Sequence, residues 1–312
     1  MTLNNAYVFP GQGSQTVGMM SGFARHLDHL RASFDTASAR LGYDLWQLVQ
    51  DGPEAQLNQT EYTQAAMLTA DVAIFKLLQS LGAIKPQWMA GHSLGEYAAL
   101  VCAESLGLED AAWLVSQRGR IMQASVPTGQ GAMGAIVGLT DEQVASICQK
   151  ASDETTMVSP ANYNAIGQVV IAGHTAAVDR ALILAEQMDA RLARLIPVSV
   201  PCHCPLLSQA ADEFADCLLQ INWRVPNVSV ISNVDLSVYK TTADIQRLLK
   251  AQLYSPVRWV ETIQLMKNNF VSCIIECGPG KVLTGLIKRI DNSIQTVTVC
   301  DDTALEQTFL FN

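Results

Sequence analysis

Five residues, Gly91-His92-Ser93-Leu94-Gly95, constrain the fold of this chain more than any other feature. They join a short apolar run at 87–91, typical of a buried strand, to a small-residue stretch at 94–104 that predicts a helix. A turn this tight leaves no room for side chains two residues either side of the serine, which accounts for both glycines. The pattern predicts a strained serine nucleophile at the carboxyl end of a strand. A plain glycine turn is the alternative interpretation.

Strands and helices alternate in the first third of the chain. Residues 6–10 form another apolar run, which ends in a Pro-Gly turn, and residues 57–81 form a long helical stretch. Alternating strands and helices favour a parallel sheet with helices on both faces, so we predict an α/β fold.

The order of predicted strands and helices changes after a linker-like segment at 126–131. The pattern then predicts a strand (132–138), a helix that opens at 140–143, a hairpin (157–162 and 168–172, turning at 164–167), a helix (175–188) and a strand (194–200). This βαββαβ order is the ferredoxin-like pattern. We predict a small subdomain, residues 128–198, inserted into a larger α/β domain formed by residues 1–127 and 199–312.

Composition limits the classes of partner and the location. The 312 residues are 49% hydrophobic and carry a net charge of −9, which indicates a globular chain and argues against a dedicated binder of nucleic acid or anionic membranes. Residues 1–6 lack the features of a secretory signal, and no apolar run approaches the roughly eighteen residues of a membrane span. Eight cysteines form no CxxC pair, and the sequence Cys202-His203-Cys204 lacks a second ligand pair with zinc spacing. We expect no metal site, and a cytoplasmic protein with reduced thiols.

A nucleophilic serine needs a base, which is normally histidine. Four of the five histidines are poorly placed for this role, because they lie in a polar helical stretch, before a helix that they can cap, or beside the nucleophile itself: His26, His29, His174 and His92. His203 remains, and we place it at the start of the helix after Pro201. The order of serine before histidine matches α/β folds that carry this elbow. A core histidine is the alternative interpretation.

The oxyanion formed by such a serine needs hydrogen-bond donors. The Leu94 amide supplies one by geometry, and the glycine-flanked loop at 9–15, directly after the first strand, is the natural source of another. This loop is no dinucleotide fingerprint, because Thr16 stands at the third glycine position. The turn at 278–281 is no P-loop, because Ile275 stands at its first glycine position.

Arg118 stands in the middle of the apolar face of a helix predicted over 111–122, whereas Arg120 points the other way. A guanidinium on an apolar face is very costly without an anionic partner. That partner is either an internal group or a carboxylate of the substrate, which arginine binds in a bidentate manner.

Taken together, these motifs resemble the malonyl-CoA:acyl carrier protein transacylases, the acyltransferases that load fatty-acid synthesis and also occur in polyketide synthases. The chain is most similar to the stand-alone bacterial form. The matching segments occur in one order along nearly the whole chain: residues 9–15, 91–96, 117–119, 198–204, 252–259 and 276–283.

The resemblance implies an α/β-hydrolase-like core with an inserted ferredoxin-like subdomain, and it assigns roles to site residues. Ser93 is implied as the acylated nucleophile and His203 as its base, with no acid orienting the histidine. The backbone amides of Gln12 and Leu94 are implied as the oxyanion hole, and Arg118 as the group that binds the malonyl carboxylate. A backbone carbonyl near Gln252 is implied to orient the histidine. The resemblance also implies substrate contact for Asn162 and Asn164, and an influence on acyl-group choice for Cys202. From the residues alone, the two asparagines are equally well explained as turn residues of the hairpin.

The function implied by the resemblance is malonyl transfer from malonyl-CoA to the phosphopantetheine thiol of acyl carrier protein, through a malonyl ester on the serine and without a cofactor. Two other classes fit parts of the sequence. The elbow alone also fits a serine hydrolase such as a thioesterase, from which Arg118 and the inserted subdomain distinguish the chain. A non-catalytic module that docks carrier proteins would not need an intact Ser93 and His203.

The acidic total conceals a basic segment. Residues 250–290 hold six basic and two acidic side chains, and three of the basic ones, Lys281, Lys288 and Arg289, share one face of a predicted helix. A solvated helix face is one interpretation. The other is that this face steers an acidic carrier protein and the coenzyme A phosphates.

Overall fold

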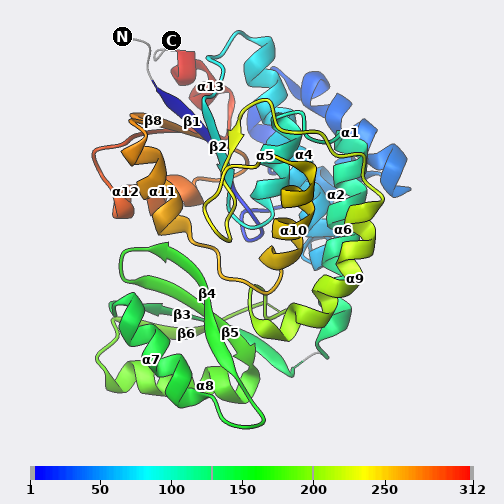
Figure 1. The fold of residues 1–312 in the computed structure, drawn as a ribbon. Coiled ribbons are helices and arrows are strands. Elements are labelled where there is room, and N and C mark those ends of the chain that lie inside the picture. The colour runs from blue at the N-terminus through cyan, green and yellow to red at the C-terminus, as the bar shows by residue number, and fades with distance from the viewer. Residues whose placement is uncertain (1–3, 128, 199, 310–312) are drawn as a thin grey trace.

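The computed structural model describes residues 4–127, 129–198 and 200–309, and it contains two units that are each built on their own sheet (Figure 1). The larger unit has a five-stranded sheet surrounded by helices, and the smaller unit has a four-stranded sheet. The predicted α/β fold is therefore confirmed. The predicted subdomain boundaries at residues 128 and 199 lie outside the described residues.

The five-stranded sheet is parallel throughout, in the order β7-β2-β1-β8-β9. Its central strand is fully buried, and its side chains alternate between two cores: Tyr7 and Phe9 pack on one face, while Ala6 and Val8 pack on the other. The strands are β1 (Asn5–Phe9), β2 (Trp88–Gly91), β7 (Ser229–Val230), β8 (Cys273–Cys277) and β9 (Gln295–Val299).

Helices cover both faces of this sheet, as the alternating pattern predicts. The face that carries Ala6 and Val8 packs against α11 (Trp259–Asn268) and α12 (Val282–Ile290). The remaining helices of the larger unit are α1 (Leu27–Leu41), α2 (Leu45–Asp51), α3 (Glu54–Leu57), α4 (Thr60–Ser80), α5 (Gly95–Cys102), α6 (Leu108–Ser125), α9 (Ser208–Leu219), α10 (Thr242–Gln252) and α13 (Asp302–Thr308), with short 3₁₀ turns at Ser21–Phe23 and Pro205–Leu207.

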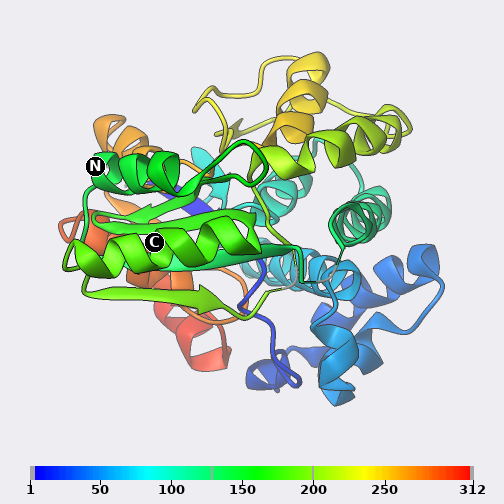
Figure 2. The same cartoon turned by 90° about the horizontal axis from the view of Figure 1, so that it is seen from below.

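The smaller unit is an antiparallel sheet of order β4-β5-β3-β6 with two helices on its outer face (Figure 2). Strand alternation divides its side chains: Val169 and Ile171 pack under the helices, and Val170 and Ala172 face the larger unit. Its elements are β3 (Gly131–Val137), α7 (Asp141–Ala151), β4 (Val158–Ala165), β5 (Gln168–His174), α8 (Thr175–Gln187) and β6 (Leu192–Ile196).

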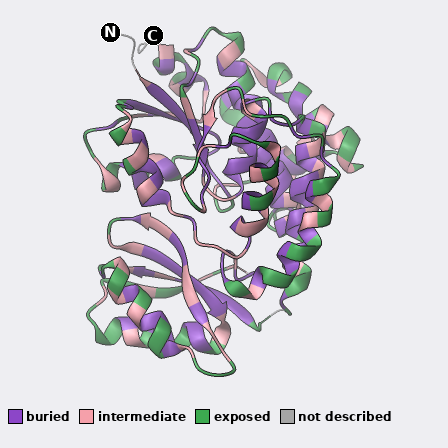
Figure 3. Cartoon of the chain, in the orientation of Figure 1, coloured by how far each residue is buried: buried purple, intermediate pink, exposed green. Residues whose placement is uncertain are grey.

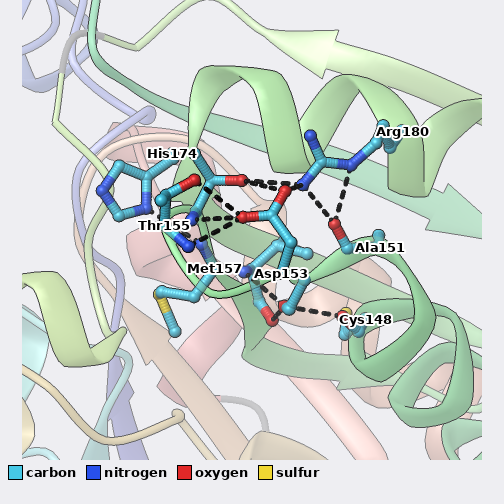
Figure 4. Close-up of polar contacts among 10 residues, drawn as sticks. Cys148, Ala151, Asp153, Thr155, Met157, His174 and Arg180 are labelled. Carbon is cyan, nitrogen blue, oxygen red and sulfur yellow. Dashed lines mark hydrogen bonds and ion pairs between the residues drawn. The ribbon is translucent and has the colours of Figure 1, made fainter.

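A polar cluster closes the loop between α7 and β4 (Figure 4). The Asp153 carboxylate accepts hydrogen bonds from the backbone and hydroxyl groups of Thr155 and Thr156, and it forms an ion pair of 2.8 Å with Arg180 on α8. The Arg180 guanidinium also donates to the Ala151 carbonyl at the end of α7, so this cluster ties the loop to both helices.

Backbone hydrogen bonds join the two units. The Val257 amide donates to the Ala161 carbonyl, and the Tyr163 amide donates to the Val257 carbonyl, so that a loop of the larger unit pairs in parallel with the edge strand β4. Buried residues continue across this seam, while the outer sides of α7 and α8 carry the exposed ones (Figure 3). The seam fixes the relative position of residues on either side of it.

Three predicted positions are wrong in detail. Asn164 lies within β4 and not in the turn, because the hairpin turns later, at residues 166–167, whereas Asn162 lies in the strand predicted for it. His203 does not start a helix: it lies in a turn at φ 61°, and α9 begins only at Ser208. The last strand of the smaller unit is β6, which ends at Ile196 rather than continuing to residue 200.

Candidate active site

The elbow holds Ser93 in a strained backbone conformation at the end of β2. Its φ is 53°, in the left-handed region that only glycine adopts freely. A Cβ on Gly91 would lie 1.8 Å from the Gly95 backbone, and one on Gly95 would lie 2.0 Å from the Phe9 carbonyl oxygen, so both glycines are required by close approach. The Asn233 side chain supports the turn, because it accepts from the Ser93 amide (2.8 Å) and donates to the Gly91 carbonyl (2.8 Å).

Ser93 and His203 form a hydrogen-bonded pair although they are 110 residues apart. The distance from Ser93 Oγ to His203 Nε2 is 2.7 Å, and His203 Nδ1 lies 2.7 Å from the Gln252 carbonyl oxygen. A carbonyl only accepts, so Nδ1 carries the ring proton and Nε2 is free to accept the serine proton. Burial, and then the nearby Arg118 charge, lower the pKa of His203 to about 3, which keeps the ring neutral at physiological pH.

The end of α10 provides the acceptor for His203. Gln252 is the last residue of this helix, and the last carbonyls of a helix lack partners within it. One of these free carbonyls accepts from the ring, and the next, that of Leu253, accepts from the His203 amide (3.0 Å). The turn that carries the histidine is thus attached to the helix at two points.

Two backbone N–H groups are free beside the serine. Leu94 stands at the N-terminus of α5, and Gln12 lies in the loop after β1; both line the cavity in front of Ser93. Neither amide has a hydrogen-bond partner in the described part of the chain. The Gln12 loop is held against the elbow because the His92 amide donates to the Phe9 carbonyl (3.0 Å). Free donors in this position suit a developing oxyanion.

Arg118 is 1% exposed and lies on the buried face of α6, where it lines the cavity, while Arg120 is exposed on the other side. Its guanidinium donates to Gln64 Oε1 (2.9 Å), to Gln252 Oε1 (2.9 Å) and to Ser93 Oγ (3.3 Å). Within the described ranges it forms no ion pair, and its Nε has no acceptor. A buried cation held by neutral oxygens and by the Tyr97 ring, whose centroid lies 5.4 Å from Arg118 Cζ, is ready to bind an anion.

The cavity has a volume of about 250 Å³ and lies between the two units. Ser93, His203 and Arg118 lie along its wall in the larger unit, and Asn162 and Asn164 contribute from β4. The side chain of Asn164 accepts from His92 Nε2 (2.8 Å), so the His92 ring points away from the nucleophile and towards the smaller unit. Cys202 also lines the cavity, and burial raises the pKa of its thiol to about 11, which keeps it neutral.

Three polar residues of this site are absent from the sequence interpretation: Gln64, Glu96 and Asn233. Glu96 is fully buried, and its carboxylate accepts from the Asn233 amide, from the Tyr239 hydroxyl and from Gln252 Nε2. A carboxylate on the buried side of a helix is the one local signal that marks Glu96. No such signal marks Asn233, which reaches the elbow from 140 residues away.

The basic face of α12 lies next to the cavity. Leu283 and Leu286 line the cavity from the buried side of this helix, while Lys281, Lys288 and Arg289 are exposed. In the described part of the chain these three cations form no ion pair, unlike the other three of the segment: Lys250 pairs with Asp212, Arg258 with Glu261 and Lys267 with Asp291. Arg289 donates to Gln168 of the smaller unit.

The described residues lack two kinds of feature. They contain no group of three or more histidine, cysteine or acidic side chains arranged to hold a metal ion. They also contain no helix of the length and apolar character needed to span a membrane.

Comparison with known proteins defines the class. Residues 6–302 match the family model of the acyl transferase domain. The malonyl CoA-acyl carrier protein transacylase of Escherichia coli (strain K12) is 47% identical over 300 residues, which are 96% of this chain and 97% of that protein. The chain therefore belongs to the acyl transferase family, in the group of the malonyl CoA-acyl carrier protein transacylases, and the resemblance drawn from its motifs is confirmed.

Comparison with solved structures leads to the same classification. The malonyl CoA-acyl carrier protein transacylase from Coxiella burnetii has a TM-score of 0.97 and 48% identity, with 99% of this chain and 98% of that chain covered. A malonyl-transacylase solved in complex with its type II PKS acyl-carrier protein has a TM-score of 0.97 and 45% identity, with 99% and 100% covered.

Proposed function

We propose that this chain transfers the malonyl group of malonyl-CoA to the phosphopantetheine thiol of acyl carrier protein, and so supplies fatty-acid synthesis. One observation carries the proposal: a buried, unpaired guanidinium, Arg118, lies within hydrogen-bond distance of the oxygen of a serine–histidine pair. A serine–histidine pair alone fits any acyl transfer. The adjacent cation selects an acyl group that carries its own carboxylate, and the names of the relatives agree.

In the first half-reaction Ser93 Oγ attacks the thioester carbonyl while His203 Nε2 takes its proton. The carbonyl oxygen becomes an oxyanion, which the Gln12 and Leu94 amides stabilise by hydrogen bonds. The carbon–sulfur bond then breaks, and coenzyme A leaves as a thiol after taking the proton from His203. A malonyl ester remains on Ser93, with its free carboxylate on Arg118.

The second half-reaction runs through the same groups in reverse. The pantetheine thiol gives its proton to His203 and attacks the ester carbonyl; the ester carbon–oxygen bond breaks, and Ser93 recovers its proton. His203 serves both halves, because the neutral ring accepts a proton from the nucleophile and the charged ring returns it to the leaving group. Asn162 and Asn164, on the opposite wall of the cavity, contact the acyl or pantetheine chain. No cofactor takes part.

We assign carrier-protein docking to the exposed face of α12 formed by Lys281, Lys288 and Arg289. The opposite side of the same helix lines the cavity, so an acidic partner bound there would place its prosthetic arm at the entrance. The three side chains are free of ion pairs within the described ranges, and they are therefore available to partner carboxylates.

We extend the proposal to the fold class of each unit. We assign the larger unit, residues 1–127 and 199–312, to the α/β-hydrolase-like class, which its parallel sheet and serine elbow support. We assign residues 128–198 to the ferredoxin-like class, supported by the βαββαβ order and by a sheet in which the first and third strands lie at the centre. Eight free cysteines fit an enzyme of the cytoplasm.

The test is to incubate the enzyme with malonyl-CoA that is radiolabelled in its malonyl group and then to isolate the protein. We expect one label per chain, none on Ser93→Ala, stability of the labelled enzyme in buffer, and discharge when holo acyl carrier protein is added. Rapid discharge into water would identify a hydrolase instead. Absence of label on the wild-type chain would contradict the proposed function altogether.

A further inference from the structure

Glu96 is a carboxylate with no access to solvent, and three hydrogen-bond donors face it. The backbone amide of Asn233 lies 3.3 Å from both carboxylate oxygens of Glu96, the Tyr239 hydroxyl donates to Oε1, and Gln252 Nε2 lies 2.5 Å from Oε2. An ionised carboxylate accepts only, so this arrangement suits its charged form. A protonated Glu96 would have to donate, and of the three groups only the Tyr239 hydroxyl can accept, because neither a backbone amide nor the Gln252 NH₂ group can.

The Gln252 side chain therefore has one orientation. Its Nε2 donates to Glu96 and to the Ser93 carbonyl (2.9 Å), and its Oε1 accepts from Arg118 Nη2 (2.9 Å). An amide turned by 180° would place its NH₂ group against a guanidinium, which has donors only. Both ends of the amide are thus specified, one by a carboxylate and the other by a cation.

This chain of contacts extends to the acyl pocket. Arg118 has two amide oxygens, from Gln64 and Gln252, and the serine oxygen as its acceptors, and these set the direction of its guanidinium. Glu96 is a buried carboxylate that interacts electrostatically with Arg118, and the Gln252 amide links the two side chains.

We propose that Glu96 is a positioning residue for malonyl selection: it fixes the orientation of the Gln252 amide, which in turn aims Arg118 at the substrate carboxylate. The proposal rests on the proposed function, since it requires Arg118 to bind the malonyl carboxylate. Glu96 does not touch the reacting atoms, and the acyl-transfer chemistry itself does not pass through it.

The substitution Glu96→Gln tests this with almost no change in shape. The new amide keeps an oxygen for Tyr239 and Asn233 and presents an NH₂ group to Gln252, so that Gln252 rotates and turns its own NH₂ group towards Arg118. We expect kcat/KM for acylation of Ser93 by malonyl-CoA to fall about 10- to 100-fold, the range for one hydrogen bond to a charged group. Acylation by acetyl-CoA, which has no carboxylate for Arg118, should change less than about threefold.

Glu276→Gln is the matched control. Glu276 is also fully buried and accepts from the backbone amides of Leu283 and Thr284, but it has no contact with Gln252 or Arg118. Any general effect of removing a buried carboxylate should lower the two acylation rates equally, so the malonyl-to-acetyl ratio should stay unchanged. An unchanged ratio in Glu96→Gln as well would overturn the proposal, whereas a wild-type chain that takes no malonyl group would instead refute the proposed function.

The wild-type pH profile is a second test that does not depend on a variant folding. Burial raises the pKa of Glu96 to about 7, and the titratable or charged groups that face it are Tyr239, Tyr97 and Arg118; both phenols have raised pKa values and stay neutral. Protonation of Glu96 should therefore lower the malonyl-to-acetyl ratio several-fold between pH 8 and pH 6. Because His203 serves both substrates, its titration affects both acylation rates equally and cancels in their ratio. A ratio that is constant over this range would count against the proposal.

Discussion

Among the polar networks of the described residues, two are built from similar kinds of side chain in opposite surroundings. In the network around Glu96, Gln252 and Arg118, all three residues are almost completely buried, and the contacts join positions 134 and 156 residues apart. In the cluster around Asp153 and Arg180, the two side chains are 50% and 41% exposed (Figure 4). Most contacts of Asp153 are made two or three residues away.

The difference in surroundings reverses the direction of the pKa shifts. Burial raises the pKa of Glu96, whereas hydrogen bonds from the Thr155 and Thr156 amides lower the pKa of Asp153. The exposed cluster stabilises a loop at little cost in desolvation. The buried network holds charge where charge is costly, and an arrangement of that kind marks a functional site more often than a purely structural one.

The largest effect is expected from removing the catalytic base, His203, which is hydrogen-bonded to Gln252 of the buried network. His203→Ala leaves Ser93 without a proton acceptor, and we expect acylation by malonyl-CoA to fall by about six orders of magnitude, as for the catalytic histidine of a serine protease. Single-turnover labelling of the protein measures this directly. The histidine is excluded as the base if Ser93 still reacts within tenfold of the wild-type rate.

The next effect comes from the cation of the buried network. Arg118→Ala should lower kcat/KM for malonyl-CoA about 100-fold, because a charged hydrogen-bond partner of the substrate is lost, while acetyl-CoA is spared or favoured. Competition between the two thioesters for Ser93 gives the ratio in one experiment. Equal losses for both substrates would show that Arg118 only supports the fold.

A smaller effect, on stability, is expected at the residue that holds the elbow. Asn233→Ala leaves the Ser93 amide and the Gly91 carbonyl without partners in the interior, so the free energy of unfolding should fall by about 2–4 kcal/mol. Asn227 in the same region is exposed and makes no side-chain hydrogen bond in the described part of the chain, so Asn227→Ala should stay within about 0.5 kcal/mol. Denaturant unfolding of both variants compares them, and equal values would remove the role assigned to Asn233.

The same contrast decides how much can be predicted from the sequence. The elbow, the alternation of strands and helices, the place of Arg118 on a buried helix face and the shared basic face of 281–289 follow from spacing and composition over short windows. The prediction places Asn164 in a turn at 164–167, whereas β4 continues to Ala165 and pairs with Val257, so that only residues 166–167 connect the two strands.

Glu96 and Asn233 illustrate what spacing cannot reveal. Their roles arise only when the segments around 96, 233 and 252 meet in space, and no local pattern specifies that meeting. His203 was found by elimination, but its turn, with φ at 61°, depends on attachment to the end of α10. Local networks are therefore open to prediction, and long-range ones need the structure.

The smallest effect is expected at the exposed cluster. Asp153→Ala removes the acceptor of the Thr155 and Thr156 amides and the partner of Arg180, and it should lower Tm slightly at pH 7 with no change in acylation of Ser93 by either thioester. Because the pKa of Asp153 is lowered in the folded chain, its contribution is complete above the ordinary aspartate value of about 4 and is lost as the pH falls further. The difference in Tm between wild type and variant should therefore shrink below pH 4, and Asp153→Asn, which keeps one acceptor oxygen, should lie between them. A change in the malonyl-to-acetyl ratio in either variant would show that the two networks are coupled, and would end the distinction between a structural and a functional cluster.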